Sequence, residues 1–286
     1  METLKHFYEA QQLSHESILE LFKLADAIRQ NPERYSESLK GKILATIFYE
    51  PSTRTRLSFE SAMLKLGGNI LTTENAKEFS SAVKGESMED TARVISKYAD
   101  CIVIRHYEEG SAHIAAEVSK VPIINAGDGK GQHPTQALLD AYTIYRELGR
   151  IENLKIAMVG DLSSGRTVRS LCYLLGKFKG IEVIFVSPDN LGMRGDIKEY
   201  LKKHGIKFRE ESDLNKILPE IDIVYMTRIQ KERISVEDYE KAKGKYVIDE
   251  SNFSLINPKA RIMHPLPHVE EIDLSIETEE TSIISP

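Results

Sequence analysis

Cysteine is scarce in this sequence, and the two cysteines present do not form a recognisable pair. Cys101 and Cys172 each lie in an apolar pattern, and neither belongs to a CxxC motif or to a zinc-site spacing. We interpret both as small core residues of a protein that works in a reducing compartment.

Long apolar runs and an excess of positive charge are also missing. No stretch approaches the ~20 apolar residues of a membrane span, and the N-terminus lacks the apolar core of a signal peptide. The formal net charge of −6 gives no overall basic field for nucleic acid. We therefore expect a cytoplasmic protein without nucleic-acid or membrane partners, which holds any anionic ligand with local clusters of Arg and Lys.

The sequence does contain enough apolar material for real cores. Its 286 residues, 41% of them hydrophobic, fit one large domain or two of ordinary size. Strand-length apolar runs alternate with segments of helical period in both halves, without internal repeats. We predict the α/β class, with two domains at residues 1–149 and 150–286. Each is expected to be a mostly parallel sheet flanked by helices, with a ligand-binding cleft between the domains.

The strongest local signal surrounds Arg54. Residues 43–49 have the composition of a buried strand, and a helical apolar stripe follows, formed by Phe59, Ala62, Met63 and Leu66. Between them, residues 52–56 (Ser-Thr-Arg-Thr-Arg) place three hydroxyls and two guanidiniums at a helix N-terminus, where free N–H groups and the helix dipole attract anions. We interpret this turn as a phosphate site; the alternative is an N-cap with solvated arginines.

Other polar groups also follow predicted strands, where open α/β sheets place ligand groups. The candidates are Arg105 at the end of strand 101–105, His133 and Gln136 on either side of Pro134 at a helix start, and Arg228 and Gln230 after strand 221–225. For each residue taken alone, a surface or capping role remains open.

The remaining elements are expected as follows. A helix capped by Ser14 ends at residues 31–32, residues 73–86 form a long loop that offers Ser80, Ser81 and Lys84, and Ser87-x-x-Asp90 is a capping box. Further strands are expected at 69–72, 121–125, 154–159, 181–187, 206–209, 246–248 and 260–263. Two prolines make residues 264–267 a rigid loop in which X-Pro bonds can be cis.

A nucleotide site is the weaker interpretation of the glycine-rich turns. Residues 160–165 have the G-x-x-x-x-G spacing of a P-loop, but Arg166 stands where a nucleotide triphosphatase needs lysine. We find no convincing metal-binding acid at a strand end, and the glycines at 127–131 do not match GxGxxG.

Seven motifs together resemble the transcarbamoylases. They are residues 52–56, the Ser80…Lys84-Gly-Glu loop, Arg105-His106, His133-Pro-Thr-Gln136, Gly165-Arg-Thr167, Met226-Thr-Arg-Ile-Gln230 and His264-Pro-Leu-Pro267. Their order and spacing are most similar to the aspartate-specific branch. The resemblance implies transfer of the carbamoyl group of carbamoyl phosphate to the amino group of L-aspartate, an early step of pyrimidine biosynthesis. It also implies a homotrimer with sites shared between subunits and no cofactor or metal, and it leaves open a separate regulatory chain.

The resemblance further implies a role for each matching residue. Phosphate would be held by Ser52, Thr53, Arg54, Thr55 and Arg105, with Ser80 and Lys84 arriving from the adjacent subunit. The carbonyl oxygen would accept hydrogen bonds from Thr55, Arg105 and His133. Gln136 would bind the carbamoyl amine. The backbone of Leu266 and Pro267, joined by a cis bond, would complete the pocket around this amine. The aspartate carboxylates would bind Arg166, Arg228 and Gln230, and Glu50, Arg166 and Arg233 would hold the domains closed.

Physical chemistry agrees with these roles. Attack of an amine on the carbamoyl carbon builds an oxyanion, which three aimed donors stabilise. Two polyanionic substrates suit bidentate guanidiniums. No covalent nucleophile is needed, and most of the rate should come from orientation and electrostatics. The proton acceptor is left open, with the departing phosphate as one candidate.

Two departures and two alternatives accompany the resemblance. His268 stands where the family usually has arginine, and the sequence ends at Pro286 where the family continues with a long helix, whose addition we expect to raise stability. The ornithine-specific branch typically carries cysteine variants of the His-Pro motifs and a Ser-Met-Gly loop, neither of which is present here. A non-catalytic homologue is the other alternative, and the complete set of charged site residues argues against it.

Overall fold

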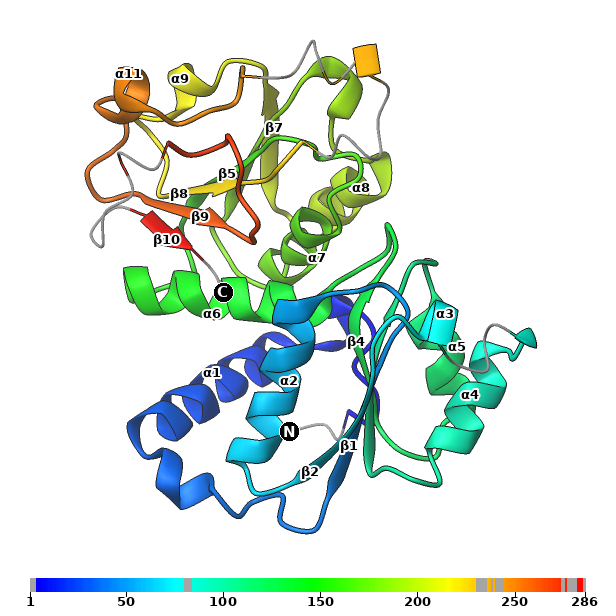
Figure 1. Ribbon diagram of the computed structural model, residues 1–286. Coiled ribbons are helices and arrows are strands. Elements are labelled where there is room, and N and C mark those ends of the chain that lie inside the picture. The colour runs from blue at the N-terminus through cyan, green and yellow to red at the C-terminus, as the bar shows by residue number, and fades with distance from the viewer. Residues whose placement is uncertain are drawn as a thin grey trace. The chain divides into compact units, whose positions relative to one another are not determined.

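The chain forms two compact α/β units in a computed structural model, which describes residues 4–79, 84–229, 236–237, 239, 244–273, 276 and 282–284. The units comprise Met1–Thr135 and Gln136–Pro286 (Figure 1). This division falls at the start of helix α6 (Pro134–Leu148), and the boundary at residues 149–150 that we propose between domains falls at its end. Within the described residues, no helix is long and apolar enough to cross a membrane.

The first unit is built on a four-stranded parallel sheet in the order β2-β1-β3-β4. The strands are β1 (Ile43–Phe48), β2 (Asn69–Thr73), β3 (Cys101–His106) and β4 (Ile123–Asp128). The helices are α1 (His15–Gln30), α2 (Thr53–Lys65), α3 (Ala76–Phe79), α4 (Met88–Ile95) and α5 (Ser111–Val118), with 3₁₀ turns at Ala10–Gln12 and Pro32–Tyr35. Met63 of α2 packs on one face of the sheet, and Ala92 of α4 and Ala115 of α5 pack on the other (Figure 1).

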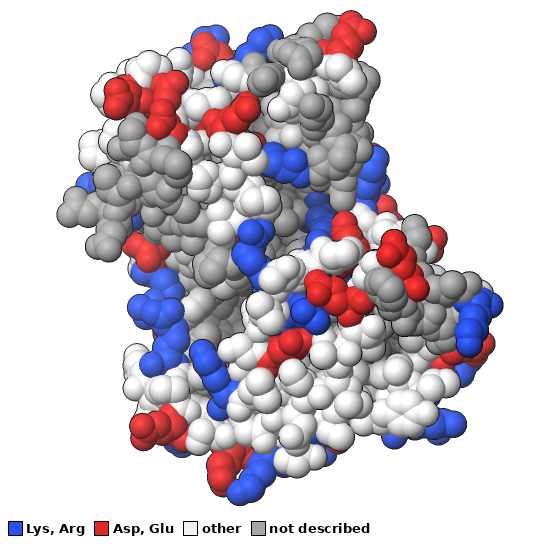
Figure 2. All heavy atoms as spheres, viewed as in Figure 1, with Lys and Arg blue, Asp and Glu red and all other residues white. Residues whose placement is uncertain are grey.

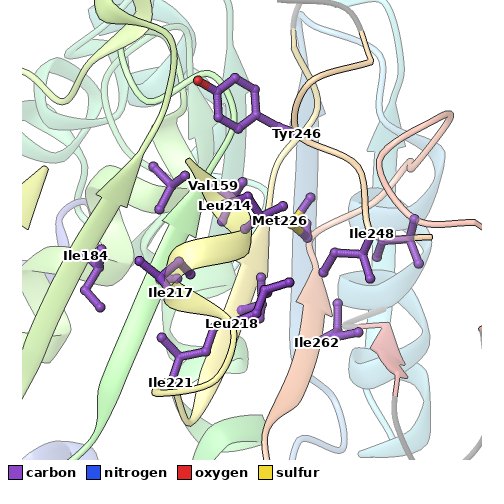
Figure 3. Packing of buried hydrophobic residues seen from close by; sticks show 14 of the residues in the cluster. Val159, Ile184, Leu214, Ile217, Leu218, Ile221, Met226, Tyr246, Ile248 and Ile262 are labelled. Carbon is purple, nitrogen blue, oxygen red and sulfur yellow. The ribbon is translucent and has the colours of Figure 1, made fainter. Parts of the chain in front are cut away.

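The second unit contains a six-stranded parallel sheet in the order β10-β9-β8-β5-β6-β7. Its strands are β5 (Lys155–Val159), β6 (Glu182–Val186), β7 (Lys207–Glu211), β8 (Ile223–Met226), β9 (Arg261–His264) and β10 (Ser282–Ile284). Besides α6, its helices are α7 (Arg166–Leu175), α8 (Gly195–Lys203), α9 (Leu214–Ile217) and α11 (Glu250–Phe253), with a 3₁₀ turn at Asp189–Leu191. Figure 3 shows Ile217 and Leu218 packing against Val159, Met226 and Ile262 of the sheet.

Most predicted elements are found in the structure, and several differences remain. The expected α/β class and parallel sheets are confirmed, and Ser14 and Ser87 accept hydrogen bonds from the backbone N–H of Ser17 and Asp90. The predicted loop 73–86 contains α3, whose four residues are too short to show a period. Residues 246–248 are not a strand, because only Ile248 forms a bridge, with Ile272. Helices α5, α8, α9 and α11 and strand β10 were not predicted.

Gly160 holds the turn that follows β5 close to the end of β8. Its φ of +113° is unfavourable for an L residue, and an added Cβ would overlap the backbone oxygen of Thr227. Thr227 is itself fixed, since its N–H and hydroxyl both donate to Val159 O at 2.8 Å.

We therefore expect Gly160→Ala to lower the free energy of unfolding by about 2–4 kcal/mol, measured by urea denaturation. Gly205→Ala is the matched control, because Gly205 also has a positive φ (+70°) but open space around its Cβ position. It should cost only about 1–2 kcal/mol. Equal losses in the two variants would show that the contact with Thr227 is unimportant.

Candidate active site

The turn between β1 and α2 presents an open helix N-terminus. Ser52 precedes α2, but its hydroxyl donates to Thr55 Oγ1 at 3.0 Å and does not cap the helix. The first N–H groups of α2 therefore keep their capacity to bind an anion. Arg54 is exposed and forms no ion pair with any residue in the described part of the chain.

Arg56 differs from Arg54, although both belong to the same motif. Its Nη2 lies 3.0 Å from Glu74 Oε2, and its Nε lies 4.0 Å from Oε1 of the buried Glu60. Thr46 and Thr72 both donate to the same Glu60 oxygen, at 2.9 and 2.6 Å. Arg56 thus anchors α2 to the sheet, whereas Arg54 is the exposed guanidinium of this motif.

Arg105 lies at the end of β3, next to the β1 turn, because Phe48 of β1 and Arg105 are register partners. The side chain is buried and fixed from two sides within the first unit. Its Nη1 donates to Ala126 O at 3.1 Å, and its Nη2 lies 3.2 Å from Glu50 Oε2. A buried guanidinium held in this way is a preorganised positive charge beside the open N-terminus of α2.

His133 follows β4, the strand next to β3. The glycine-rich loop before it is folded around Asp128, whose carboxylate accepts from Gln132 N at 2.7 Å and from Gly110 N at 2.8 Å. Burial raises the pKa of Asp128. The imidazole of His133 is also buried, and its Nδ1 lies 3.4 Å from Thr135 Oγ1. The loop is therefore a structural support that fixes the position of His133.

The second unit collects its candidate residues in the same manner. Arg166 begins α7 directly after the β5 turn, Arg228 follows β8, and Leu266 and Pro267 follow β9. These three strands are neighbours in the sheet, so their carboxyl ends lie at one edge. The Leu266–Pro267 bond is cis, and Leu266 N donates to His264 Nδ1 at 2.9 Å. Gln136 lies in the first turn of α6, where its amide donates to Asp140.

The other expected site residues are described only in part. Lys84 is exposed. Ser80, Gln230 and Arg233 lie outside the described residues. Glu50 pairs with Arg105 within the first unit, and its expected role in domain closure, shared with Arg166, stays a prediction. Among the described residues, no cluster of His, Cys, Asp or Glu is arranged to hold a metal ion.

Sequence reasoning missed Asp140, which contacts Gln136, and Tyr225, which contacts Asp140. Asp140 accepts the amide of Gln136, and Tyr225 donates to the same carboxylate. The i,i+4 spacing of Gln136 and Asp140 was a signal that could have identified the first contact. On the face of the molecule seen in Figure 2, Lys and Arg are interspersed with Asp and Glu.

Comparison with known proteins gives a consistent result over the whole chain. Residues 5–146 match the family described as the aspartate/ornithine carbamoyltransferase carbamoyl-P binding domain, and residues 152–286 match its Asp/Orn binding domain. The aspartate carbamoyltransferase catalytic subunit of Methanocaldococcus jannaschii is 53% identical over 277 residues, which cover 96% of this chain and 90% of that protein. The chloroplastic aspartate carbamoyltransferase 3 of Pisum sativum is 52% identical, with 95% and 70% covered.

Solved structures agree with the sequence matches. The catalytic subunit of M. jannaschii aspartate transcarbamoylase has a TM-score of 0.88 at 52% identity, covering 97% of this chain and 91% of that one. Aspartate transcarbamoylase from Trypanosoma cruzi, in complex with carbamoyl phosphate and aspartate, has a TM-score of 0.90 at 36% identity, covering 97% and 89%. The chain therefore belongs to the aspartate/ornithine carbamoyltransferase family.

Proposed function

We propose that this protein transfers the carbamoyl group of carbamoyl phosphate to the amino group of L-aspartate. The products are N-carbamoyl-L-aspartate and phosphate, in pyrimidine biosynthesis. The observation that carries the proposal is the exposed Arg54 at the uncapped N-terminus of α2, beside the fixed guanidinium of Arg105. Relatives about half identical in sequence carry the name of this activity, and a related structure holds both substrates.

Residues 1–149 are proposed to bind carbamoyl phosphate. Phosphate oxygens accept hydrogen bonds from the N–H groups at the start of α2, from the hydroxyls of Ser52, Thr53 and Thr55, and from Arg54. Arg105 bridges phosphate and the carbonyl oxygen, to which Thr55 and His133 also donate. Gln136 accepts a hydrogen bond from the carbamoyl amine, and so do backbone groups of Leu266 and Pro267.

Residues 150–286 are proposed to bind aspartate. Arg166 and Arg228 follow neighbouring strands of one sheet, and a guanidinium matches a carboxylate in charge and planar geometry. Gln230 is the third proposed ligand. This arrangement suits a substrate with two carboxylates.

The reaction needs no covalent intermediate. The aspartate amine attacks the carbamoyl carbon, the C–O bond to phosphate breaks, and the amine loses a proton, for which the departing phosphate is a candidate acceptor. Negative charge that develops on the carbonyl oxygen is stabilised by Thr55, Arg105 and His133. Holding the two substrates together contributes the remaining rate enhancement.

A comparison of two amine substrates tests the assignment of aspartate as the acceptor. With carbamoyl phosphate saturating, the colorimetric yield of ureido product should give a kcat/KM for aspartate at least about 100-fold above that for ornithine. The physical reason is that ornithine carries an ammonium group at the position where Arg228 is proposed to bind a carboxylate of aspartate. Faster turnover of ornithine would reverse the choice, and no product from either amine would favour a non-catalytic homologue.

The assembly is also part of the proposal. We propose a homotrimer in which Ser80 and Lys84 of one chain reach the phosphate site of its neighbour, which would explain an exposed lysine at this position. A separate regulatory chain and the cytoplasmic location stay predictions.

A further inference from the structure

The loop that follows β9 turns around one buried side chain, that of His264. Its imidazole is 1% exposed, and its Nδ1 accepts a hydrogen bond from the backbone N–H of Leu266 at 2.9 Å. A backbone N–H can only donate, so Nδ1 carries no proton in this arrangement. The neutral ring then holds its proton on Nε2, which lies 3.9 Å from Oε2 of Glu271. His264 is therefore present as the tautomer that accepts at Nδ1.

The end of the same loop fixes the group that faces the other nitrogen of the ring. Oε2 of the buried Glu271 accepts from the backbone N–H of Val269 at 2.8 Å and of Glu270 at 3.2 Å. The backbone of Glu271 is held as well, since its carbonyl accepts from Ile248 N at 3.0 Å. The orientation of the His264 imidazole is thus set by contacts that all lie within the second unit.

The backbone conformation of Leu266 explains why an acceptor is needed at His264. The φ of Leu266 is +56°, in the left-handed region that is unfavourable for an L residue. A hydrogen bond from the N–H of residue i+2 to the side chain of residue i closes a turn, as asparagine and aspartate side chains do in Asx-turns. Without that acceptor, Leu266 can relax to a negative φ, which rotates the peptide groups on either side of it.

Residues 265–267 consequently present a backbone without a usable donor. Pro265 and Pro267 have no N–H, and the N–H of Leu266 is used by His264. Within the described residues, the carbonyl oxygens of Leu266 and Pro267 accept no hydrogen bond. A ligand at this segment therefore meets backbone acceptors, which match the NH₂ group of a carbamoyl compound and give a methyl group no hydrogen bond.

We propose that His264 is a positioning residue that makes this segment selective for an N–H donor on the acyl carbon of the phosphate substrate. This inference rests on the proposed function, in which the backbone of Leu266 and Pro267 binds the carbamoyl amine. His264 acts without a contact to the substrate, because it uses the Leu266 N–H and holds Leu266 in its left-handed conformation. The acceptor at Nδ1 is the property that produces this effect, and it can be tested separately from the size of the ring.

Acetyl phosphate is the probe, because it replaces the carbamoyl amine by a methyl group and leaves the phosphate and carbonyl unchanged. Selectivity is the ratio of its inhibition constant to the KM for carbamoyl phosphate. His264→Gln places the amide one carbon beyond the position of Nδ1, so it should lower this ratio about tenfold through a higher KM for carbamoyl phosphate. The inhibition constant of acetyl phosphate should change by less than about twofold, because its methyl group uses no acceptor.

His264→Asn is the matched rescue variant. The asparagine Oδ1 can take the place of Nδ1 and accept from the N–H of Leu266, as in an Asx-turn, so the ratio should stay within about twofold of wild type. His264→Leu fills the buried space without an acceptor and should lower the ratio as His264→Gln does. It serves as the second test if His264→Gln does not fold.

Asn257→Ala is the control for the general loss of a loop contact. Asn257 Oδ1 accepts from Lys259 N at 3.1 Å, which is also a contact between the side chain of residue i and the N–H of residue i+2. It lies before β9, at the opposite end of the strand from His264. The ratio should therefore be unchanged in Asn257→Ala.

Several results would overturn the inference. Equal weakening of both phosphates in His264→Gln, or an equally low ratio in His264→Asn, would give His264 a purely structural role. Loss of the fold in both variants that lack an acceptor would lead to the same conclusion. Ureido product from the wild type with an unchanged ratio in His264→Gln would reject the inference alone. Absence of ureido product from the wild type would reject the proposed function and this inference with it.

Discussion

Replacing Arg54 by alanine should lower the kcat/KM of carbamoyl transfer by about 10³-fold or more, with the fold intact. Arg54 is exposed and pairs with no carboxylate in the described part of the chain, so its removal leaves no buried charge behind. Its proposed partner is a phosphate that carries increasing charge as the C–O bond breaks. The guanidinium is therefore worth more in the transition state than in the free protein.

Arg56→Ala provides the contrast, because it changes the same residue type in the same turn of α2. Loss of Arg56 would remove the ion pair with Glu74 and leave the buried Glu60 without its nearby cation. We expect it to lower the free energy of unfolding by about 1–3 kcal/mol, whereas Arg54→Ala should leave that energy nearly unchanged. For both variants, steady-state kinetics measure kcat/KM, and urea denaturation measures the free energy of unfolding. An Arg54→Ala protein with near-normal kcat, or one that is unfolded, would contradict the assignment.

Mixing two inactive variants should restore activity if the site is shared between chains. Arg54→Ala and Lys84→Ala should each be almost inactive as separate preparations. In the proposed cyclic trimer, each site takes Arg54 from one chain and Lys84 from the adjacent chain. After dissociation and random reassembly of an equal mixture, roughly a quarter of the sites contain both wild-type residues, because each required chain has a one-half chance. Activity should return to about that fraction of wild type.

Native mass spectrometry provides the control, since it shows whether chains have exchanged. Wild-type protein taken through the same dissociation sets the scale for recovered activity. If exchange is complete and the mixture stays inactive, Lys84 acts within its own chain and the shared-site proposal is wrong.

Local sequence patterns predicted the elements whose formation depends on residues close together in the sequence. Strand β1 and helix α2 could be predicted because β1 is a continuous apolar run of strand length and α2 carries an apolar stripe of helical period. The different roles of Arg54 and Arg56 could not, because Thr72 and Glu74 come close to Arg56 only when α2 packs beside β2. The isolated bridge at Ile248 likewise depends on Ile272, which lies far along the chain.

The candidate site shows the same limit. Residues at strand ends were accessible to sequence reasoning, because parallel sheets place their carboxyl ends at one edge. The contact between Asp140 and Tyr225 spans 85 residues and joins a helix to a central strand, so no local pattern indicates it. The family resemblance identified residues that touch substrate, and the structure was needed to find those that hold them in place.

Product identification with labelled substrate tests the central claim most directly. Purified protein is incubated with ¹³C-carbamoyl phosphate and unlabelled L-aspartate, and ¹³C and ³¹P spectra are recorded together. We predict that the label moves into the ureido carbon of N-carbamoyl-L-aspartate while inorganic phosphate appears in equal amount, at a rate proportional to protein concentration. Release of phosphate without a labelled ureido carbon, at the rate seen without protein, would contradict carbamoyl transfer to aspartate.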